Sequence, residues 1–486
     1  LVLLALAVGA VSAGATFALG FVRHARPGAD GDVLAVVLFL WTGGQLAQAA
    51  SAGGDTTLRP EVFALLPLPA RRLAWSLLAV SLADPVVLLV LVAEAGLIPL
   101  AAAGGPVAAT SGLAAAVLAT VLTVVLATLV GGVLGPGAGR GRDVGTVVVA
   151  LALSLLALGG TLLPAAVTAL DDGHARWLSI VVHGLPSGWG VNAADAGRSG
   201  HPVTAVLWLA ALAGLTGLAA VAWPSVLRRR IGRPPRTHRA GGTLRPRRFL
   251  PASAAGAVCA KELRLWVRDP VRLTCLLIAV VVGLGVALVP RVTAGSGLLM
   301  PFGGALTVVI AGACACNLYG NDGTSLWLTI MTPGSARPDL RGRQTAWLIA
   351  VAPFSVLETV TLTATSGEPT LWPWAIALVI ALLGGAAGLV PVLSLLAVQP
   401  LDEAGNPTPG WSVKVHLALY CTVATALPAA AMLVLGASAG SALTQWAAVP
   451  VAAATAALLA WWGRRHATRR LPRVQIDVLR LLAAAA

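Results

Sequence analysis

Long apolar stretches separated by short polar segments dominate the chain. Twelve of the stretches are close to the roughly 20 residues that a helix needs to cross the hydrocarbon core of a bilayer. Their apolar residues run on without alternating with polar ones, which favours helices over the strands of a membrane barrel. The predicted spans are residues 1–21, 33–50, 73–97, 107–134, 144–170, 203–227, 273–290, 298–316, 345–363, 371–398, 415–435 and 443–462.

Polar residues divide these stretches into two halves joined by a basic linker. The first half takes residues 1–227, the linker 228–253, and the second half with its tail 254–486. Residues 228–248 hold nine arginines and no acidic residue. A basic segment beside a span is typical of contact with anionic lipid. It has no aromatic residue and no recognisable nucleic-acid-binding pattern, so nucleic acid is not an expected partner.

The composition excludes a soluble globular protein. Hydrophobic residues make up 57% of the 486 residues and charged residues only 11%, whereas soluble domains carry about 25% charged residues. The expected fold class is therefore an all-α polytopic membrane protein, with its transmembrane helices arranged as two six-helix repeats.

The distribution of basic residues predicts the orientation in the membrane. With twelve spans and the N-terminus inside, five of the 33 basic residues fall outside and the rest fall inside. Cytoplasmic loops carry an excess of Lys and Arg. We therefore expect a multi-pass protein of a bacterial cytoplasmic membrane with both termini in the cytoplasm.

A charged segment stands before the seventh predicted span. Residues 255–268 mix charged and apolar positions as an amphipathic helix does, and Asp269-Pro270 ends it because a residue before proline is pushed out of the α region. The sequence therefore predicts a helix on the membrane surface that turns sharply into a span. Its marker residues are Lys261, Glu262, Arg264, Trp266, Arg268 and Asp269.

The two halves share a polar segment after their second span. Each copy begins with glycine and aspartate, continues through hydroxyl residues and a short apolar helix, and ends with proline, an arginine pair and tryptophan. Because six spans separate the copies, both enter from the same side, as parallel repeats. The candidate contact residues are Asp55, Arg59, Glu61 and Phe63 in the first copy and Asp322, Trp327, Arg341 and Arg343 in the second.

Together these features resemble the ABC-2 type transporter permeases. Residues 261–270 resemble the connecting elbow helix of that family, and residues 317–343 resemble the cytoplasmic loop of its actinobacterial members. The resemblance implies two fused six-span domains whose loops touch a separate ABC ATPase subunit, expected in two copies. It implies ATP-driven transport, with export as the expected direction. Membrane lipid and a transported substrate, which the sequence does not name, are the other expected partners.

The chain has no nucleotide-binding motif of its own. Its two lysines are Lys261 and Lys414, and neither fits the Gly-x-x-x-x-Gly-Lys-Ser/Thr pattern that cradles phosphates. We therefore expect no directly bound cofactor and no enzyme activity, with ATP used by the partner subunit. No elbow segment precedes residue 1, so either the first half lacks this element or the beginning of the chain is missing.

Acidic residues inside predicted spans support a second hypothesis. Asp84, Glu94 and Glu358 lie in apolar stretches, where acids are costly and often functional. They are consistent with a proton- or cation-coupled secondary transporter, or with structural pairing inside the bundle. A polytopic membrane enzyme is the third hypothesis, but the sequence has no His-Glu-x-x-His motif and no Asp-rich diphosphate motif.

Overall fold

The protein is helical throughout the part of the chain that its structure, a computed structural model, describes. The described residues are 2–23, 26, 28–52, 69–134, 147, 150–151, 153–154, 158–172, 176–231, 251–396, 398–399 and 411–484, and they contain no strand. The chain forms two compact units, Leu1–Thr237 and His238–Ala486. The all-α fold class predicted from the apolar stretches is therefore confirmed, and each unit has a core of its own.

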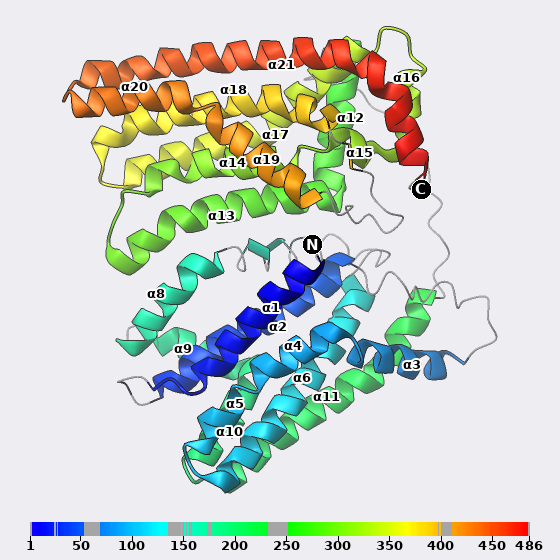
Figure 1. The fold of residues 1–486 in the computed structure, drawn as a ribbon, viewed down its shortest axis with the longest axis vertical. Coiled ribbons are helices and arrows are strands. Elements are labelled where there is room, and N and C mark those ends of the chain that lie inside the picture. Colours follow the sequence, from blue (N-terminus) through cyan, green and yellow to red (C-terminus); the bar gives the residue numbers. More distant parts are fainter. Residues whose placement is uncertain are drawn as a thin grey trace. The chain divides into compact units, whose positions relative to one another are not determined.

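The first unit contains ten described α-helices and one short 3-10 turn (Figure 1). These elements are α1 (Val2–Leu19), α2 (Ala29–Ala52), α3 (Ala70–Leu82), α4 (Pro85–Glu94), α5 (Leu97–Ala102), α6 (Pro106–Leu134), α8 (Gly159–Asp171), α9 (Arg176–Gly184), η2 (Pro186–Gly188), α10 (Trp189–Arg198) and α11 (Pro202–Ile231).

The core of the first unit lies where α2, α5 and α10 meet α6. Leu34 and Leu38 of α2, Leu97 of α5 and Val191 of α10 are fully buried together. Helices α5 and α6 approach closely at Gly112, where a Cβ would lie 2.5 Å from the Leu97 carbonyl oxygen. Small residues at such crossings let apolar helices pack backbone to backbone, as is common inside membranes.

The third predicted span is broken in the structure. Helix α3 ends before Asp84, which adopts an extended conformation because Pro85 follows it, and α4 then begins at Pro85. The Asp84 carboxylate accepts a hydrogen bond from the Val86 amide at 2.8 Å and caps α4. The apolar span runs from Pro85 to Ala102 through α4 and α5, so the expected boundaries of 73–97 need correction.

The second unit holds the charged segment and the second polar copy. Its elements are α12 (Ala254–Arg268), α13 (Pro270–Ala294), η3 (Met300–Phe302), α14 (Gly303–Cys314), α15 (Leu318–Asp322), η4 (Gly323–Leu326), α16 (Trp327–Ile330), α17 (Ala336–Thr365), η5 (Pro369–Leu371), α18 (Trp372–Leu396), α19 (Trp411–Ala424), α20 (Leu427–Ser438) and α21 (Ala442–Ala484).

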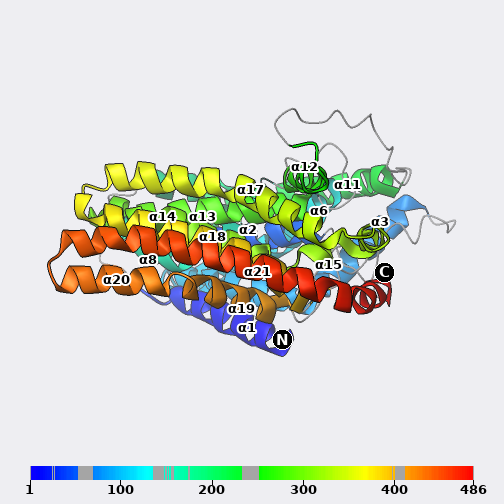
Figure 2. The same ribbon diagram turned by 90° about the horizontal axis from the view of Figure 1, so that it is seen from above.

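Helix α18 is at the centre of the second unit. It packs against α14, α17, α19 and α21, and it runs alongside α21 in both views (Figures 1 and 2). Gly384 and Gly388 make the contact with α21 close, because a Cβ on Gly388 would lie 2.3 Å from the Leu459 carbonyl oxygen. The Gln344 side chain of α17 donates to the Ala387 carbonyl at 2.8 Å and ties a third helix to this pair.

Eight stretches of the described chain are long and apolar enough to cross a membrane, or nine if the pair α19 and α20, bent by 44°, counts as one span. Three further expected spans contain shorter apolar helices among the described residues, namely Gly9–Leu19, Leu162–Asp171 and Met300–Cys314. The chain is therefore a multi-pass membrane protein by length and composition of its helices, while the count of twelve stays a prediction.

Candidate functional site

The charged segment of the second unit folds as an amphipathic helix that ends at a sharp turn. Helix α12 begins at Ser253, whose hydroxyl accepts a hydrogen bond from the Gly256 amide at 3.1 Å. It ends because Asp269 precedes Pro270 and is extended, with ψ of 117°. The Asp269 carboxylate accepts from the Val271 amide at 3.0 Å and caps α13. The chain thus turns from α12 into α13, which runs across the direction of α12 (Figures 1 and 2).

Two buried arginines hold the carboxylate of Glu262, which projects from α12 into the protein. Arg272, near the start of α13, donates from Nη1 to Glu262 Oε2 at 2.5 Å. Arg343 of α17 places its Nη1 3.1 Å from Glu262 Oε1. All three side chains are at most 3% exposed. Buried ion pairs therefore connect α12, α13 and α17.

The same arginines hold Asp322 at the end of α15. Arg343 donates from Nη2 to Asp322 Oδ2, and Arg272 places its Nη2 3.5 Å from Asp322 Oδ1. Lys261 of α12, which is exposed, donates to Asp322 Oδ2 at 3.1 Å. These contacts fix residues 318–331, the α15–α16 segment, to α12 and α17.

Asp339 is the fourth acid of the cluster and lies on α17. Arg343 donates from Nε to Asp339 Oδ2 at 3.0 Å, and the Tyr319 hydroxyl donates to the same oxygen at 2.8 Å. The guanidinium carbon of Arg343 lies 4.5 Å from the centre of the Tyr319 ring, a cation–π contact. We call this cluster the elbow ion network. Its members are Lys261, Glu262, Asp269, Arg272, Asp322, Asp339 and Arg343.

The arginines keep the buried acids of the network ionised. Burial raises the pKa of Glu262, but Arg343 and Arg272 outweigh burial, so the pKa lies below its ordinary value. The pKa of Asp322 is lowered in the same way, with Arg343 and Lys261 acting against burial. Both acids are therefore negative at neutral pH, and losing one basic partner would leave their buried charges less well compensated.

The α15–α16 segment presents an apolar surface beside this network. Leu326 is buried at its centre, against Tyr319 of α15 and Leu471 of α21. Trp327 and Met331 point the other way and are 50% and 72% exposed. An ordered segment that ends in exposed apolar side chains, next to charged groups, is typical of a surface that another molecule covers.

The structure separates the residues that the sequence assigned to partner contact in the second half. Trp327 and Arg341 lie on the surface. Asp322 and Arg343 lie inside the elbow ion network, where their side chains are 3% and 0% exposed. The buried pair therefore positions the segment, and the exposed pair, together with Met331, is what a partner is able to touch.

The residues that marked the charged helix α12 also divide between its two faces. Glu262 and Trp266 are buried, Trp266 within the main apolar core of the unit. Lys261 and Arg268 are exposed, and Arg264 and Asp269 are partly exposed. The first polar copy, with Asp55, Arg59, Glu61 and Phe63, and most of the linker 228–253 lie outside the described residues.

The three acids expected inside spans occupy different environments. Asp84 is exposed and caps α4. Glu94 is 1% exposed, and its Oε2 has no hydrogen-bond partner among the described residues. Glu358 is 5% exposed, and its Oε2 accepts from the Thr307 hydroxyl at 2.5 Å. The other oxygen of Glu358, Oε1, is buried without a partner in the described part of the chain.

A second polar cluster lies in the first unit, around His183 of α9. His183 Nε2 lies 3.0 Å from Asp32 Oδ1, and its Nδ1 lies 2.5 Å from Asn192 Oδ1. Asn192 Nδ2 donates a hydrogen bond to the His183 carbonyl oxygen at 3.0 Å, and this bond orients the Asn192 amide group. Both ring nitrogens therefore face acceptors, which suits the imidazolium form. Burial lowers the pKa of His183, but the hydrogen bonds to Asp32 and Asn192 outweigh burial and raise it.

The sequence also contains one Gly-x-Ser-x-Gly pattern, at residues 436–440. In hydrolases this pattern forms a strained turn between a strand and a helix that exposes the serine nucleophile. Ser438 instead ends α20, and its hydroxyl donates to the Leu435 carbonyl at 3.0 Å. This serine therefore lacks the geometry of a nucleophile elbow.

Two members of the elbow ion network, Arg272 and Asp339, and the neighbouring Tyr319 were not singled out from the sequence. Arg272 stands directly before the seventh predicted span at 273–290, and Tyr319 and Asp339 lie in the loop 317–343 but were not among its candidate contact residues. The spacing of Asp339 and Arg343, four residues apart on one helix, was a usable signal because it places them on the same face. No sequence pattern indicates that Arg272, on another helix, joins them.

Comparison with known proteins adds nothing to this geometry. No protein family, curated protein or solved structure matches the chain.

Proposed function

We propose that the chain is the permease subunit of an ATP-driven ABC transporter, an exporter whose ATPase is a separate cytoplasmic subunit bound in two copies. The observation that carries this proposal is the exposed apolar surface of the α15–α16 segment, with Trp327 and Met331, fixed by the elbow ion network. A permease driven by another subunit needs such a surface, because the conformational change that ATP hydrolysis causes in the ATPase reaches the membrane helices only through a protein contact.

The elbow ion network suits the transmission of that force. Glu262 and Asp322 each contact both Arg272 and Arg343. These ion pairs connect four elements, α12, α13, α15 and α17. Helices α13 and α17 are both long and apolar enough to span the membrane. A displacement of the α15–α16 segment would therefore act on two spans at once.

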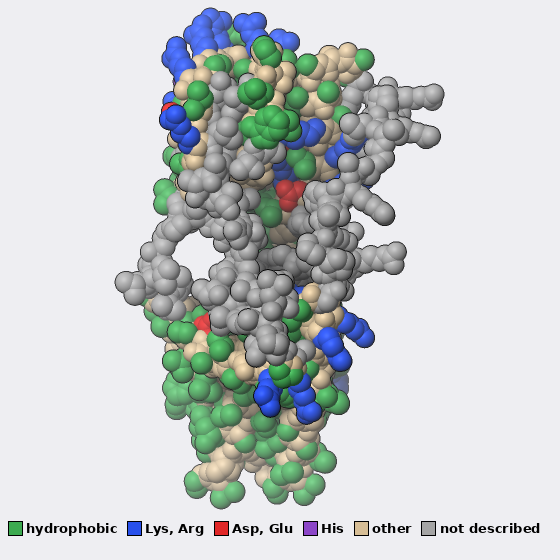
Figure 3. All heavy atoms as spheres, turned by 90° about the vertical axis from the view of Figure 1, so that its right-hand side faces the viewer, with side chains coloured by type: hydrophobic (Ala, Val, Ile, Leu, Met, Phe, Trp, Pro, Cys, Tyr) green, Lys and Arg blue, Asp and Glu red, His purple; other side chains and the backbone are tan. Residues whose placement is uncertain are grey.

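Basic side chains support placing this end of the second unit in the cytoplasm. Arg465, Arg469, Arg473 and Arg480 are exposed along the end of α21, and Figure 3, which faces this side, shows basic side chains gathered at its top. Cytoplasmic ends of spans carry an excess of Lys and Arg. In the proposed topology, twelve spans form two parallel six-helix repeats in a bacterial cytoplasmic membrane, with both termini inside.

In this proposal the partner subunit, and not this chain, binds and hydrolyses ATP. Neither of the two lysines lies in a phosphate-binding loop sequence. The first polar copy, around Asp55 and Phe63, would provide the second docking surface. Two docking surfaces on one chain account for an ATPase in two copies.

The experiment compares Trp327→Glu with Leu443→Glu. Leu443 is 83% exposed and lies at the start of α21, at the opposite end of the second unit from α16 (Figure 1). Both variants should insert and purify in normal yield. Only Trp327→Glu should lose co-purification of the ATPase and stimulated ATP hydrolysis. Intact ATPase binding in Trp327→Glu and in a Phe63→Glu counterpart would refute the coupling assignment.

One observation favours a second candidate, a proton- or cation-coupled carrier. Glu358 is buried within a span and one of its oxygens has no partner among the described residues, and buried acids at membrane depth are often part of ion pathways. Glu358→Gln should abolish gradient-driven transport by such a carrier while leaving folding intact. Transport driven by a proton gradient with no ATPase present would overturn the ATP-driven proposal.

A further inference from the structure

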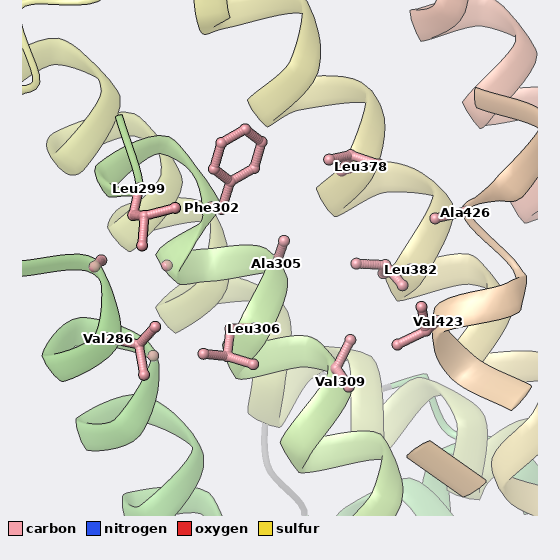
Figure 4. Close-up of a pocket in the computed structure, with 13 residues that line it drawn as sticks. Val286, Leu299, Phe302, Ala305, Leu306, Val309, Leu378, Leu382, Val423 and Ala426 are labelled. Carbon is pink, nitrogen blue, oxygen red and sulfur yellow. The ribbon is translucent and has the colours of Figure 1, made fainter. Parts of the chain in front are cut away.

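A cavity of about 350 Å³, partly open to the outside, lies in the second unit between α13, α14, α18 and the end of α19. Figure 4 shows the side chains of Leu306, Leu382 and Val423 around the space between these helices, with Phe302 at one side. Its size falls in the range of small-molecule sites, about 300–1,000 Å³. The elbow ion network contributes no residue to it.

The lining of the cavity is apolar throughout. Among the described residues it consists of Gly, Ala, Val, Leu and Phe, with no hydroxyl, amide or charged side chain. A water molecule needs two to four polar partners, so this lining holds water poorly and favours apolar ligands; an enclosed apolar cavity of about 150 Å³ takes up benzene. The apolar side chains that line the cavity therefore favour a hydrocarbon group as its ligand.

The cavity lies at the depth of the apolar part of the membrane. Val286 of α13 and Leu378 of α18 line it, and each lies roughly 10 Å inside the nearer end of its helix at 1.5 Å per residue. Both helices belong to the apolar spans. At this depth the molecules that compete for the space are hydrocarbon chains.

A broken span borders the cavity. Helix α19 ends at Ala424 and α20 begins at Leu427, with a bend of 44° between them. Val423 and Ala426, on either side of the break, both line the cavity. Pro428 in the first turn of α20 has no amide hydrogen to continue the helix. In many secondary transporters, interrupted helices border the substrate site.

We infer that this cavity binds a single hydrocarbon chain of an amphipathic molecule. Two sources supply that chemistry, a resident phospholipid and a transported amphiphile. Binding itself needs only a membrane-inserted protein, whereas identifying the chain with the transported substrate rests on the proposed function. Loss of ATPase coupling in Trp327→Glu would therefore leave binding intact, which keeps the two proposals separately testable.

The test is photo-crosslinking of the full chain in nanodiscs. The probe is a phosphatidylglycerol with a diazirine in the middle of one acyl chain, and labelled peptides are mapped by mass spectrometry. Peptides of α13, α14 and α18 that line the cavity should be labelled. Ala305→Phe, which fills the buried wall, should reduce that labelling at least fivefold, while Leu357→Phe on the exposed surface of α17 should not.

A second variant provides the same test if Ala305→Phe fails to fold. Val423 is exposed at the rim of the cavity, so Val423→Trp narrows the entrance without overpacking the core, and it should give the same loss. Equal labelling of the cavity peptides in the wild type, Ala305→Phe and Val423→Trp would overturn the inference.

Competition identifies the source of the chain. Unlabelled dodecylamine, added to nanodiscs that contain the labelled phospholipid, should displace cavity labelling if the site exchanges with free amphiphiles. Persistent labelling assigns the site to a resident phospholipid, and either result supports a hydrocarbon-chain site. Labelling of cavity peptides no stronger than that of the lipid-facing peptide around Leu357 would contradict it.

Discussion

Replacing Glu262 with glutamine removes the charge that two buried arginines share. Glu262→Gln keeps the shape of the side chain but leaves Arg272 and Arg343 with one carboxylate fewer, in positions that are at most 3% exposed. Breaking a buried ion pair by removing one partner costs about 3–5 kcal/mol, and the loss here should be at the lower end, about 3 kcal/mol, because Arg272 and Arg343 both keep Asp322 as a partner. We expect a loss of stability of this size in the second unit.

The loss converts into a measurable shift of the unfolding midpoint. For a domain of this size about 1 kcal/mol corresponds to roughly 2–4 °C, so Glu262→Gln should unfold roughly 6–12 °C below the wild type. A thiol-reactive dye reports unfolding in detergent, because Cys259 and Cys316 are free and buried. The matched control is Asp477→Asn, which removes an ion pair to Arg480 whose side chains are 78% and 80% exposed, and it should leave the midpoint unchanged.

A double variant tests whether the effect belongs to the network. If Glu262 and Arg272 stabilise each other, Glu262→Gln with Arg272→Gln should lose less stability than the sum of the two single losses. A midpoint for Glu262→Gln within error of the Asp477→Asn control would refute the claim that the network holds α12, α13 and α17 together. Strict additivity would refute the direct pairing.

Two further predictions concern other parts of the fold. Because the pKa of His183 is raised, the stability that its charge contributes is full below the unfolded-state value of about 6.5 and is lost as pH rises through the folded-state pKa. Hydrogen exchange in α9, corrected for intrinsic pH effects, should accelerate in that range in the wild type, and an identical step in His183→Gln would contradict this. Gly388→Leu should force α18 and α21 apart, because even its Cβ meets the Leu459 carbonyl oxygen at 2.3 Å, and should cost about 1–3 kcal/mol. Gly214→Leu, with open space around it, is the control, and equal unfolding midpoints for the two variants would contradict the close packing.

The helical membrane architecture follows from local sequence features, because a bilayer requires long apolar helices with satisfied backbones. The turn between α12 and α13 is of the same kind, since Asp269-Pro270 ends one helix and begins the next by backbone chemistry alone. The break at Asp84-Pro85 has the same cause. There the apolar pattern continued on both sides, so the sequence predicted one span across it.

Contacts between distant segments were harder to predict. Nothing near Asp322 in the sequence shows that Arg343 and Lys261 surround it, because helix packing brings together residues that lie 21 and 61 positions away. The repeated polar segment suggested a contact role for both Asp322 and Arg343, whereas their burial shows that they position the segment. The cavity beside Val423 had no sequence signal either, because its apolar lining is indistinguishable from that of any span.

The most direct test of the central claim is photo-crosslinking from position 327 in native membranes. A benzoyl-phenylalanine replaces Trp327 in one variant and Leu443 in another, both exposed apolar positions. Position 327 should crosslink to a protein that binds an ATP analogue and carries a phosphate-binding loop, and position 443 should not. Crosslinks from position 327 to lipid alone, or to the same protein from both positions, would contradict the central claim.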